Sequence, residues 1–229
     1  MIKGLRRSFI GLTQGRTSWC VVSIRSLSQA NSNIDIDSII ENYFPNGERP
    51  TEKDINCVSE RQLDHPINDV IVIDKIKCKH GYPRAYVYYP LGKNKKYYSG
   101  HLRLTCPLLV KAIDDYEDNG GIREINLEVA ENPSLKINFA ETNAAWINIR
   151  RECMTPSDVA LVKQRYGDNF DQLCGEAGIL GLMSTDDVKC LHAHVADHIM
   201  RGCNKIGEIA LATLENKGVE INGCAGAFI

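Results

Sequence analysis

The pattern of apolar and polar positions changes along the chain, from strand-like runs to longer stretches of helical spacing. Three runs are rich in β-branched and aromatic side chains, namely residues 70–77, 84–90 and 97–105. The short links between them carry glycine, proline and asparagine, which are turn residues. This spacing predicts an antiparallel β-meander, in which the first and third strands run in the same direction.

Apolar positions at helical spacing dominate the sequence around these runs. The predicted helices cover residues 39–44, 51–63, 107–119, 132–151, 155–166, 188–198 and 205–216. Thr51 and Asp54 form a capping-box pattern at the start of the helix over 51–63. Gly120 and Gly121 are predicted to end the helix over 107–119. Residues 122–129 fit either a strand or a helix. The predicted fold class is α+β, a small antiparallel β-meander packed against several helices, as a single domain after a targeting segment.

Residues 1–34 have the composition of a targeting segment. They carry five basic and no acidic residues, and their apolar stripe at helical spacing opposes a basic side. The sequence Arg-Ser-Leu-Ser at residues 25–28 resembles an arginine-type matrix-processing site with the cut after Leu27. These features predict import into the mitochondrial matrix. A plastid address and a disordered basic tail are the alternatives.

The rest of the chain is predicted as a linker with a short helix over residues 35–50, the α+β domain over 51–217 and an irregular tail over 218–229. A hydrophobic content of 43% is enough for one core. The formal charge is −2, so the chain after the basic first 34 residues carries −7, which argues against nucleic-acid binding. No apolar run approaches about 18 residues, so no transmembrane helix is expected. Protein partners are not identified, and an organellar complex stays open.

The predicted helix over residues 188–198 carries the densest group of side chains that bind metals or transfer protons. These are Cys190, His192, His194, Asp197 and His198. At helical spacing, positions 190, 194 and 197 or 198 share one face. The aspartates at positions 186 and 187 are predicted to cap the helix. The paired carboxylates at 114–115 and 117–118 are interpreted instead as a solvated helix face.

Nine cysteines without a C-x-x-C pair favour reduced thiols in an intracellular compartment, some of them metal ligands. Cys78 follows the first strand of the predicted meander and Cys106 ends the third, so both fall at the same edge of the sheet. We expect Cys190 to approach them there, as a third ligand of one tetrahedral metal site.

One nitrogen or oxygen from His192, His194 or Asp197 is expected to complete this site. His192 can join only if Cys190 stands at the start of the helix, since the two side chains diverge within a regular helix. Thiolate and imidazole ligands suit zinc best, with iron as the alternative. The competing interpretation is a buried thiol cluster whose histidines bond to the backbone.

Several short motifs within residues 51–216 resemble the bacterial family catalogued as domain of unknown function 501. They are Arg61-Gln62-Leu63, Cys78 with Gly81 and Pro83, Leu104-Thr105-x-Pro107, Gly121-Ile122-Arg123-Glu124, Val188 to His192 with Ala196, and Asn204 with Gly207. The resemblance implies that Cys78, Cys190 and His192 are site members. Relatives can carry histidine at positions 106 and 197, which exchanges one metal-binding residue type for another. The family has no established reaction.

These observations favour an organellar metalloprotein, specifically a metal-dependent hydrolase in which His194 or Asp197 transfers the proton. A non-catalytic protein with a structural metal or thiol cluster, serving a partner complex, is the alternative. A thiol redox sensor is a third class, which requires an exposed, reactive cysteine near a second one. An open coordination position distinguishes the catalytic metal site from the structural one.

Overall fold

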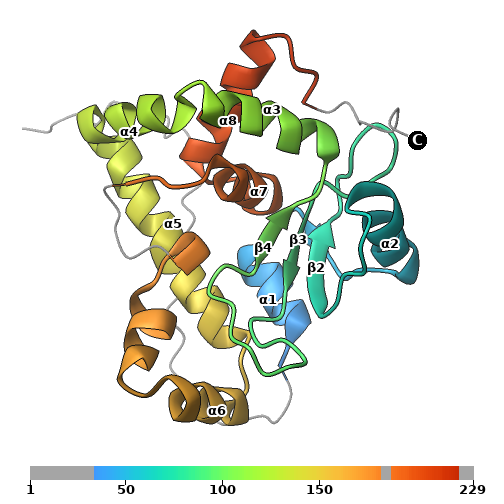
Figure 1. The fold of residues 1–229 in the computed structure, drawn as a ribbon, viewed down its shortest axis with the longest axis vertical. Coiled ribbons are helices and arrows are strands. Elements are labelled where there is room, and N and C mark those ends of the chain that lie inside the picture. The colour runs from blue at the N-terminus through green and yellow to red at the C-terminus, as the bar shows by residue number, and fades with distance from the viewer. Residues whose placement is uncertain (1–33, 182–186, 222–229) are drawn as a thin grey trace, which may run out of the picture.

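The computed structural model describes residues 34–181 and 187–221, which form an α+β fold as predicted (Figure 1). In chain order the elements are α1 (Ile36–Tyr43), β1 (Gly47–Glu48), α2 (Glu52–Cys57), η1 (Val58–Gln62), β2 (Val70–Asp74), β3 (Ala85–Tyr88), β4 (Leu102–Leu104), α3 (Pro107–Asp118), α4 (Gly121–Glu131), α5 (Pro133–Glu152), α6 (Pro156–Tyr166), η2 (Gly167–Asn169), η3 (Gln172–Glu176), η4 (Ile179–Gly181), α7 (Leu191–Arg201) and α8 (Lys205–Asn216). Within these described ranges, no helix has both the length and the apolar character needed to cross a membrane.

The predicted meander is confirmed as an antiparallel sheet with strand order β1-β2-β3-β4, in which the short β1 is an addition. The third run forms a strand only at its end, in β4. Its first part forms an isolated bridge between Tyr97 and Leu91. The Ser99 carbonyl accepts bonds from the Arg150 guanidinium, at 3.1 Å from Nε and 2.9 Å from Nη2. A carbonyl engaged in this way is less available for a strand ladder, so pairing begins later in the run.

The two faces of the sheet bury alternate residues, as the pleat requires. Val72, Val87 and Leu104 face the main core with the helices, whereas Ile73 and Tyr86 face a smaller core under α2 and η1. Helix α7 lies at the centre, against β2, β3 and β4 on one side and against α3 and α8 on the others (Figure 1). A helix in this position has little exposed surface, and nine of its residues are buried.

Local signals account for most helix boundaries. The capping box at Thr51 and Asp54 is confirmed, and α8 has the predicted bounds. The ambiguous residues 122–129 are helical, within α4. Gly120 adopts a left-handed φ of 92°, which ends α3 and lets α4 begin at the next residue. Ile125 and Val129, one turn apart, then face the core.

Candidate metal centre

Helix α7 begins later than its sequence predicts, because a side chain from α4 holds the preceding segment. The Asn126 amide accepts a bond from the Val188 N–H at 2.7 Å and donates to the Val188 carbonyl at 3.1 Å. The prediction that Asp187 caps the helix is therefore wrong. Asp187 precedes α7, and its carboxylate accepts a hydrogen bond from the Asn126 amide at 3.1 Å. Asp186 lies outside the described residues. The N-cap is Cys190, with an extended backbone at φ −155° and ψ 114°.

This late start brings Cys190 and His192 together. Within a regular helix, side chains two residues apart point in different directions. Because Cys190 is still extended, its Sγ lies 3.8 Å from His192 Nδ1. The condition for His192 to join Cys190 is met.

A third ligand atom comes from α3. Glu117 Oε1 lies 3.4 Å from His192 Nδ1 and accepts the Leu191 backbone N–H at 2.5 Å. That N–H belongs to the first residue of α7, where helix amides lack partners within the helix. The first turn of α7 therefore orients the carboxylate. Ligand atoms of Glu117, Cys190 and His192 all lie within 4.8 Å of one another.

Two of the three separations between these ligand atoms match those around a tetrahedral metal ion. An ion with bonds of about 2.0–2.3 Å separates neighbouring ligand atoms by roughly 3.3–3.8 Å. The sulfur–nitrogen and nitrogen–oxygen separations at His192 are 3.8 and 3.4 Å. One thiolate, one imidazole and one carboxylate form a donor set that zinc accepts. The residues present therefore fit the predicted ion.

The second ring nitrogen of His192 has the partners that a metal-binding histidine usually has. His192 Nε2 lies 3.3 Å from the Val110 carbonyl and 3.3 Å from Asp114 Oδ1. A proton on Nε2 can be donated to either oxygen, which leaves Nδ1 with a lone pair directed at Cys190 and Glu117. Both partners come from α3, so the same helix supplies Glu117 and fixes the imidazole.

The electrostatics of the group favour a positive charge at its centre. Burial lowers the pKa of His192, but the bond to Cys190 and the charges of Cys190 and Glu117 outweigh it and raise the pKa to about 9. The imidazolium then carries the positive charge that a metal ion would supply beside the Cys190 sulfur and the Glu117 carboxylate. A metal must displace this proton, so its binding is coupled to pH.

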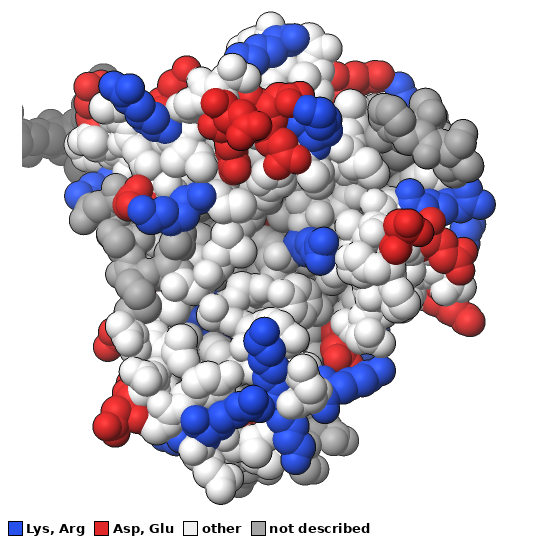
Figure 2. Space-filling model, in the orientation of Figure 1, with Lys and Arg blue, Asp and Glu red and all other residues white. Residues whose placement is uncertain are grey.

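Acidic side chains gather on the surface over α3 (Figure 2). Asp114, Asp115 and Asp118 are exposed, and Glu117 is half-buried beside them. Such a cluster raises the local concentration of cations at low ionic strength. The candidate site thus lies beneath a surface that attracts metal cations.

A family model described as "Protein of unknown function (DUF501)" matches residues 74–212, more than half of the chain. The chain belongs to the DUF501 family. No curated protein and no solved structure matches it. The DUF501 region contains Glu117, Cys190 and His192, whereas α1, β1 and α2 precede it.

The geometry divides the cysteines predicted as ligands in this DUF501 chain. Cys190 belongs to the three-residue group, and Cys78 and Cys106 do not belong to any such group among the described residues. Cys78 is buried in the link between β2 and β3, and Cys106 is the buried N-cap of α3. The site shared by all three sulfurs, as expected from their place at one sheet edge, is replaced by a site that Glu117 completes.

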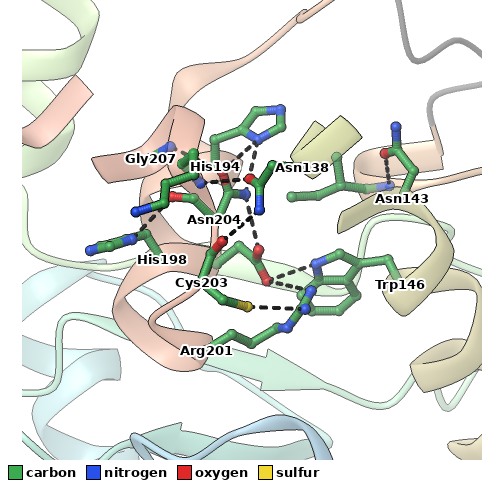
Figure 3. A network of polar contacts seen from close by, with 12 residues as sticks. Asn138, Asn143, Trp146, His194, His198, Arg201, Cys203, Asn204 and Gly207 are labelled. Carbon is green, nitrogen blue, oxygen red and sulfur yellow. Dashed lines mark hydrogen bonds and ion pairs between the residues drawn. The ribbon is translucent and has the colours of Figure 1, made fainter. Parts of the chain in front are cut away.

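The two residues predicted to transfer protons, His194 and Asp197, are both fully buried within the DUF501 region, and Figure 3 shows His194 in its polar network. Asp197 is fully buried and accepts bonds from Trp146 Nε1 at 2.8 Å and Asn204 Nδ2 at 2.9 Å. Asn204 Nδ2 also lies 3.0 Å from Nδ1 of His194, and its Oδ1 caps α8 by accepting the Gly207 N–H at 3.0 Å. A role in catalysis stays a prediction, and the burial favours a structural one.

His194 is neutral at physiological pH in this network. Burial lowers its pKa to about 4, although the charge of Asp197 opposes the shift. Nδ1 lies 3.0 Å from Asn204 Nδ2 and 3.3 Å from Asn204 Oδ1, and Nε2 is buried without a hydrogen-bond partner among the described residues. A buried imidazole of this kind holds α7 against α8.

Proposed function

We propose that this protein binds a divalent transition-metal ion, preferentially zinc, through Glu117, Cys190 and His192, and that it is a metal-dependent hydrolase. The observation that carries the proposal is the convergence of three ligand types from two helices, with the second nitrogen of His192 already bonded. Three protein ligands leave one tetrahedral position for water or substrate, as catalytic zinc sites do.

The residues around the site suit this chemistry. When bound, the ion supplies a Lewis acid and lowers the pKa of a water on the fourth position. Asp114 is exposed, at 55% of its side chain, and holds the His192 ring from the solvent side. The Glu117 carboxylate accepts a hydrogen bond from the first backbone N–H of α7, which restricts the rotation of this side chain. The chain thus orients two of its three ligands before an ion arrives.

Metal content tests the ligand set. Protein purified without chelators or metal resins is expected to carry one zinc ion per chain by elemental analysis. Cys190→Ser, His192→Gln and Glu117→Gln should each weaken zinc binding by at least about tenfold, because each removes one of three ligands. The matched controls Cys57→Ser, His80→Gln and Glu131→Gln change the same residue types outside the group and should leave binding unaltered. Equal zinc affinity in both sets would contradict the proposal.

Cobalt substitution separates this proposal from a structural metal site closed by the other cysteines. The thiolate-to-cobalt absorption band grows with the number of bound sulfurs, so the intensity of one thiolate is expected here. Cys78→Ser and Cys106→Ser should leave that band unchanged. If either substitution weakens it, the site is a closed thiolate-rich one, which supports the non-catalytic alternative.

We further propose that the protein acts in the mitochondrial matrix. The support is the acid-free, basic composition of residues 1–34, which lie almost entirely outside the described residues. A fluorescent protein fused to residues 1–34 is expected to enter mitochondria, and the endogenous protein should begin near Ser28. Plastid fluorescence would support the alternative address, and cytosolic fluorescence with an intact Met1 would refute both.

A further inference from the structure

A second site lies on the outer face of the sheet, away from the residues of the metal group. It is a cavity of about 400 Å³, within the range of small-molecule sites. Tyr86, Tyr88, Tyr89 and Tyr98 line it, together with Arg103, Lys93 and residues 65–69. Helix α2 and η1 cover the neighbouring part of this face, so the cavity forms where their cover ends.

The aromatic wall is continuous. The rings of Tyr86 and Tyr88 lie 5.9 Å apart and tilted by 54°, and those of Tyr88 and Tyr98 lie 6.0 Å apart at 75°. Tyr88 donates its hydroxyl proton to the Gly100 carbonyl at 2.5 Å, which fixes its ring. Tyr88 and Tyr98 are partly exposed, so their rings offer stacking surface to a planar ligand, whereas Tyr86 is buried. Such stacking tolerates different ring systems.

The charged groups at the cavity favour an anion. The lining includes two basic side chains, Arg103 and Lys93, and one carboxylate, that of Asp69. The Arg103 guanidinium contacts the Tyr86 hydroxyl, and within the described part of the chain it forms no ion pair with a carboxylate. Among residues 34–181 and 187–221, the one bond of Lys93 is to the neutral Asn68 side chain, at 3.2 Å. An exposed guanidinium beside aromatic rings presents two parallel donors to a phosphate or carboxylate.

The surrounding surface agrees with this charge. The link between β3 and β4 adds Lys95 and Lys96, and Lys96 Nζ lies 5.4 Å above the Tyr98 ring. Figure 2 shows basic side chains gathered at the lower end of this view, whereas the acidic cluster over α3 lies at the other end. Anions are therefore steered to the tyrosine-lined end and cations to the metal end.

We propose that the cavity binds a mononucleotide, with its base against the tyrosines and its phosphate on Arg103 and Lys93. The size of the cavity favours one ring system with one attached anion over an extended chain. The proposal does not depend on metal binding at Glu117, because the two sites share no residue.

Calorimetry with three probes tests the two halves of the ligand separately. AMP carries both ring and anion, adenosine lacks the phosphate, and ribose 5-phosphate lacks the base. AMP is expected to bind saturably. Adenosine and ribose 5-phosphate should each bind at least about tenfold more weakly than AMP. An absence of saturable AMP binding would overturn the proposal. Ribose 5-phosphate binding as tightly as AMP would also overturn it, because the tyrosines would then contribute nothing.

Arg103→Gln is the deciding variant, since the side chain is exposed and its loss should not unfold the domain. It is expected to weaken AMP binding about tenfold or more, and Arg103→Lys by less, because lysine keeps the charge but not the paired donors. Arg123→Gln, an exposed arginine of α4, is the control and should bind AMP like the unaltered protein. Equal AMP binding by Arg103→Gln would contradict the site.

Two further measurements complete the test. Tyr98→Leu should weaken AMP and leave ribose 5-phosphate binding unchanged, provided that its melting temperature shows a folded domain. A short single-stranded oligoribonucleotide should bind no more tightly than AMP. If it binds much more tightly, the occupant is a nucleic-acid chain, and the assignment to a mononucleotide is wrong.

Discussion

Acidification from about pH 6.5 to pH 4 is expected to remove most of the free energy of unfolding, because the fold buries two neutral histidines. Burial lowers the pKa of His101 to about 3, assisted by the charge of Arg150, and that of His194 to about 4. In the unfolded chain both titrate near 6.5. Below that pH the two histidines are protonated in the unfolded state and stay neutral in the folded state. The free energy of unfolding therefore falls as the pH falls.

The expected size of this effect follows from the same values. Each histidine lowers the free energy of unfolding by about 1.4 kcal/mol per pH unit, hence by about 3 kcal/mol at pH 4. The two together remove about 6–7 kcal/mol, comparable to the whole stability of an ordinary domain. His192 does not add to this slope. Its pKa is raised to about 9, so its contribution is complete below 6.5 and is lost as the pH rises toward 9.

Urea unfolding followed by circular dichroism at several pH values between 7.5 and 4 measures the slope. His194→Gln should lower stability at pH 7.5 but reduce the slope by about half, because one of the two titrating groups is gone. His80→Gln, at an exposed position, should retain the full slope. A stability that stays constant down to pH 4.5 would show that these imidazoles are not held neutral.

Gly207→Ala is expected to destabilise the domain by about 3 kcal/mol or more, at the upper end for overpacked cores. A Cβ at this position would lie 2.1 Å from the His194 carbonyl oxygen and 2.7 Å from its carbon. Both are backbone atoms of α7, so α8 must move away as a unit. The melting temperature should fall by roughly 10 °C, since about 1 kcal/mol shifts it by 2–4 °C in a chain of this size.

Gly175→Ala is the matched control for this prediction. Its Cβ would meet Arg151 Nη2 at 3.1 Å, the end of a side chain that can move. Its melting temperature is expected to stay within a few degrees of that of the unaltered protein. A thermal scan in which the two variants lose equal stability would contradict the close packing of α7 on α8.

Features set by residues close in sequence were predictable. The capping box at Thr51, the proline at the start of α3 and the bounds of α8 depend on neighbours within a few positions. The meander followed from the spacing of three runs. The start of α7 was not predictable, because it depends on Asn126, which is 62 positions before Val188.

The candidate site was predictable only for the part that one segment supplies. Cys190 and His192 stand out as a metal-binding pattern, whereas Glu117 lies among exposed carboxylates of α3 and has no distinguishing neighbour. Its role arises because α3 packs beside the first turn of α7. The inclusion of Cys78 and Cys106 assumed that nearness to one sheet edge is enough, but a ligand set requires atoms within a few ångströms.

The central place of α7 has a consequence for the order in which the chain becomes stable during synthesis. The sheet is complete once residue 104 has been made, yet the helix that covers its inner face ends at residue 201. Until then, Val72, Val87 and Leu104 lack that covering helix, and exposed strands of this kind associate with other chains. The inner face of the sheet therefore gains its cover only after about 97 further residues have followed β4, so this core closes late in the order of synthesis.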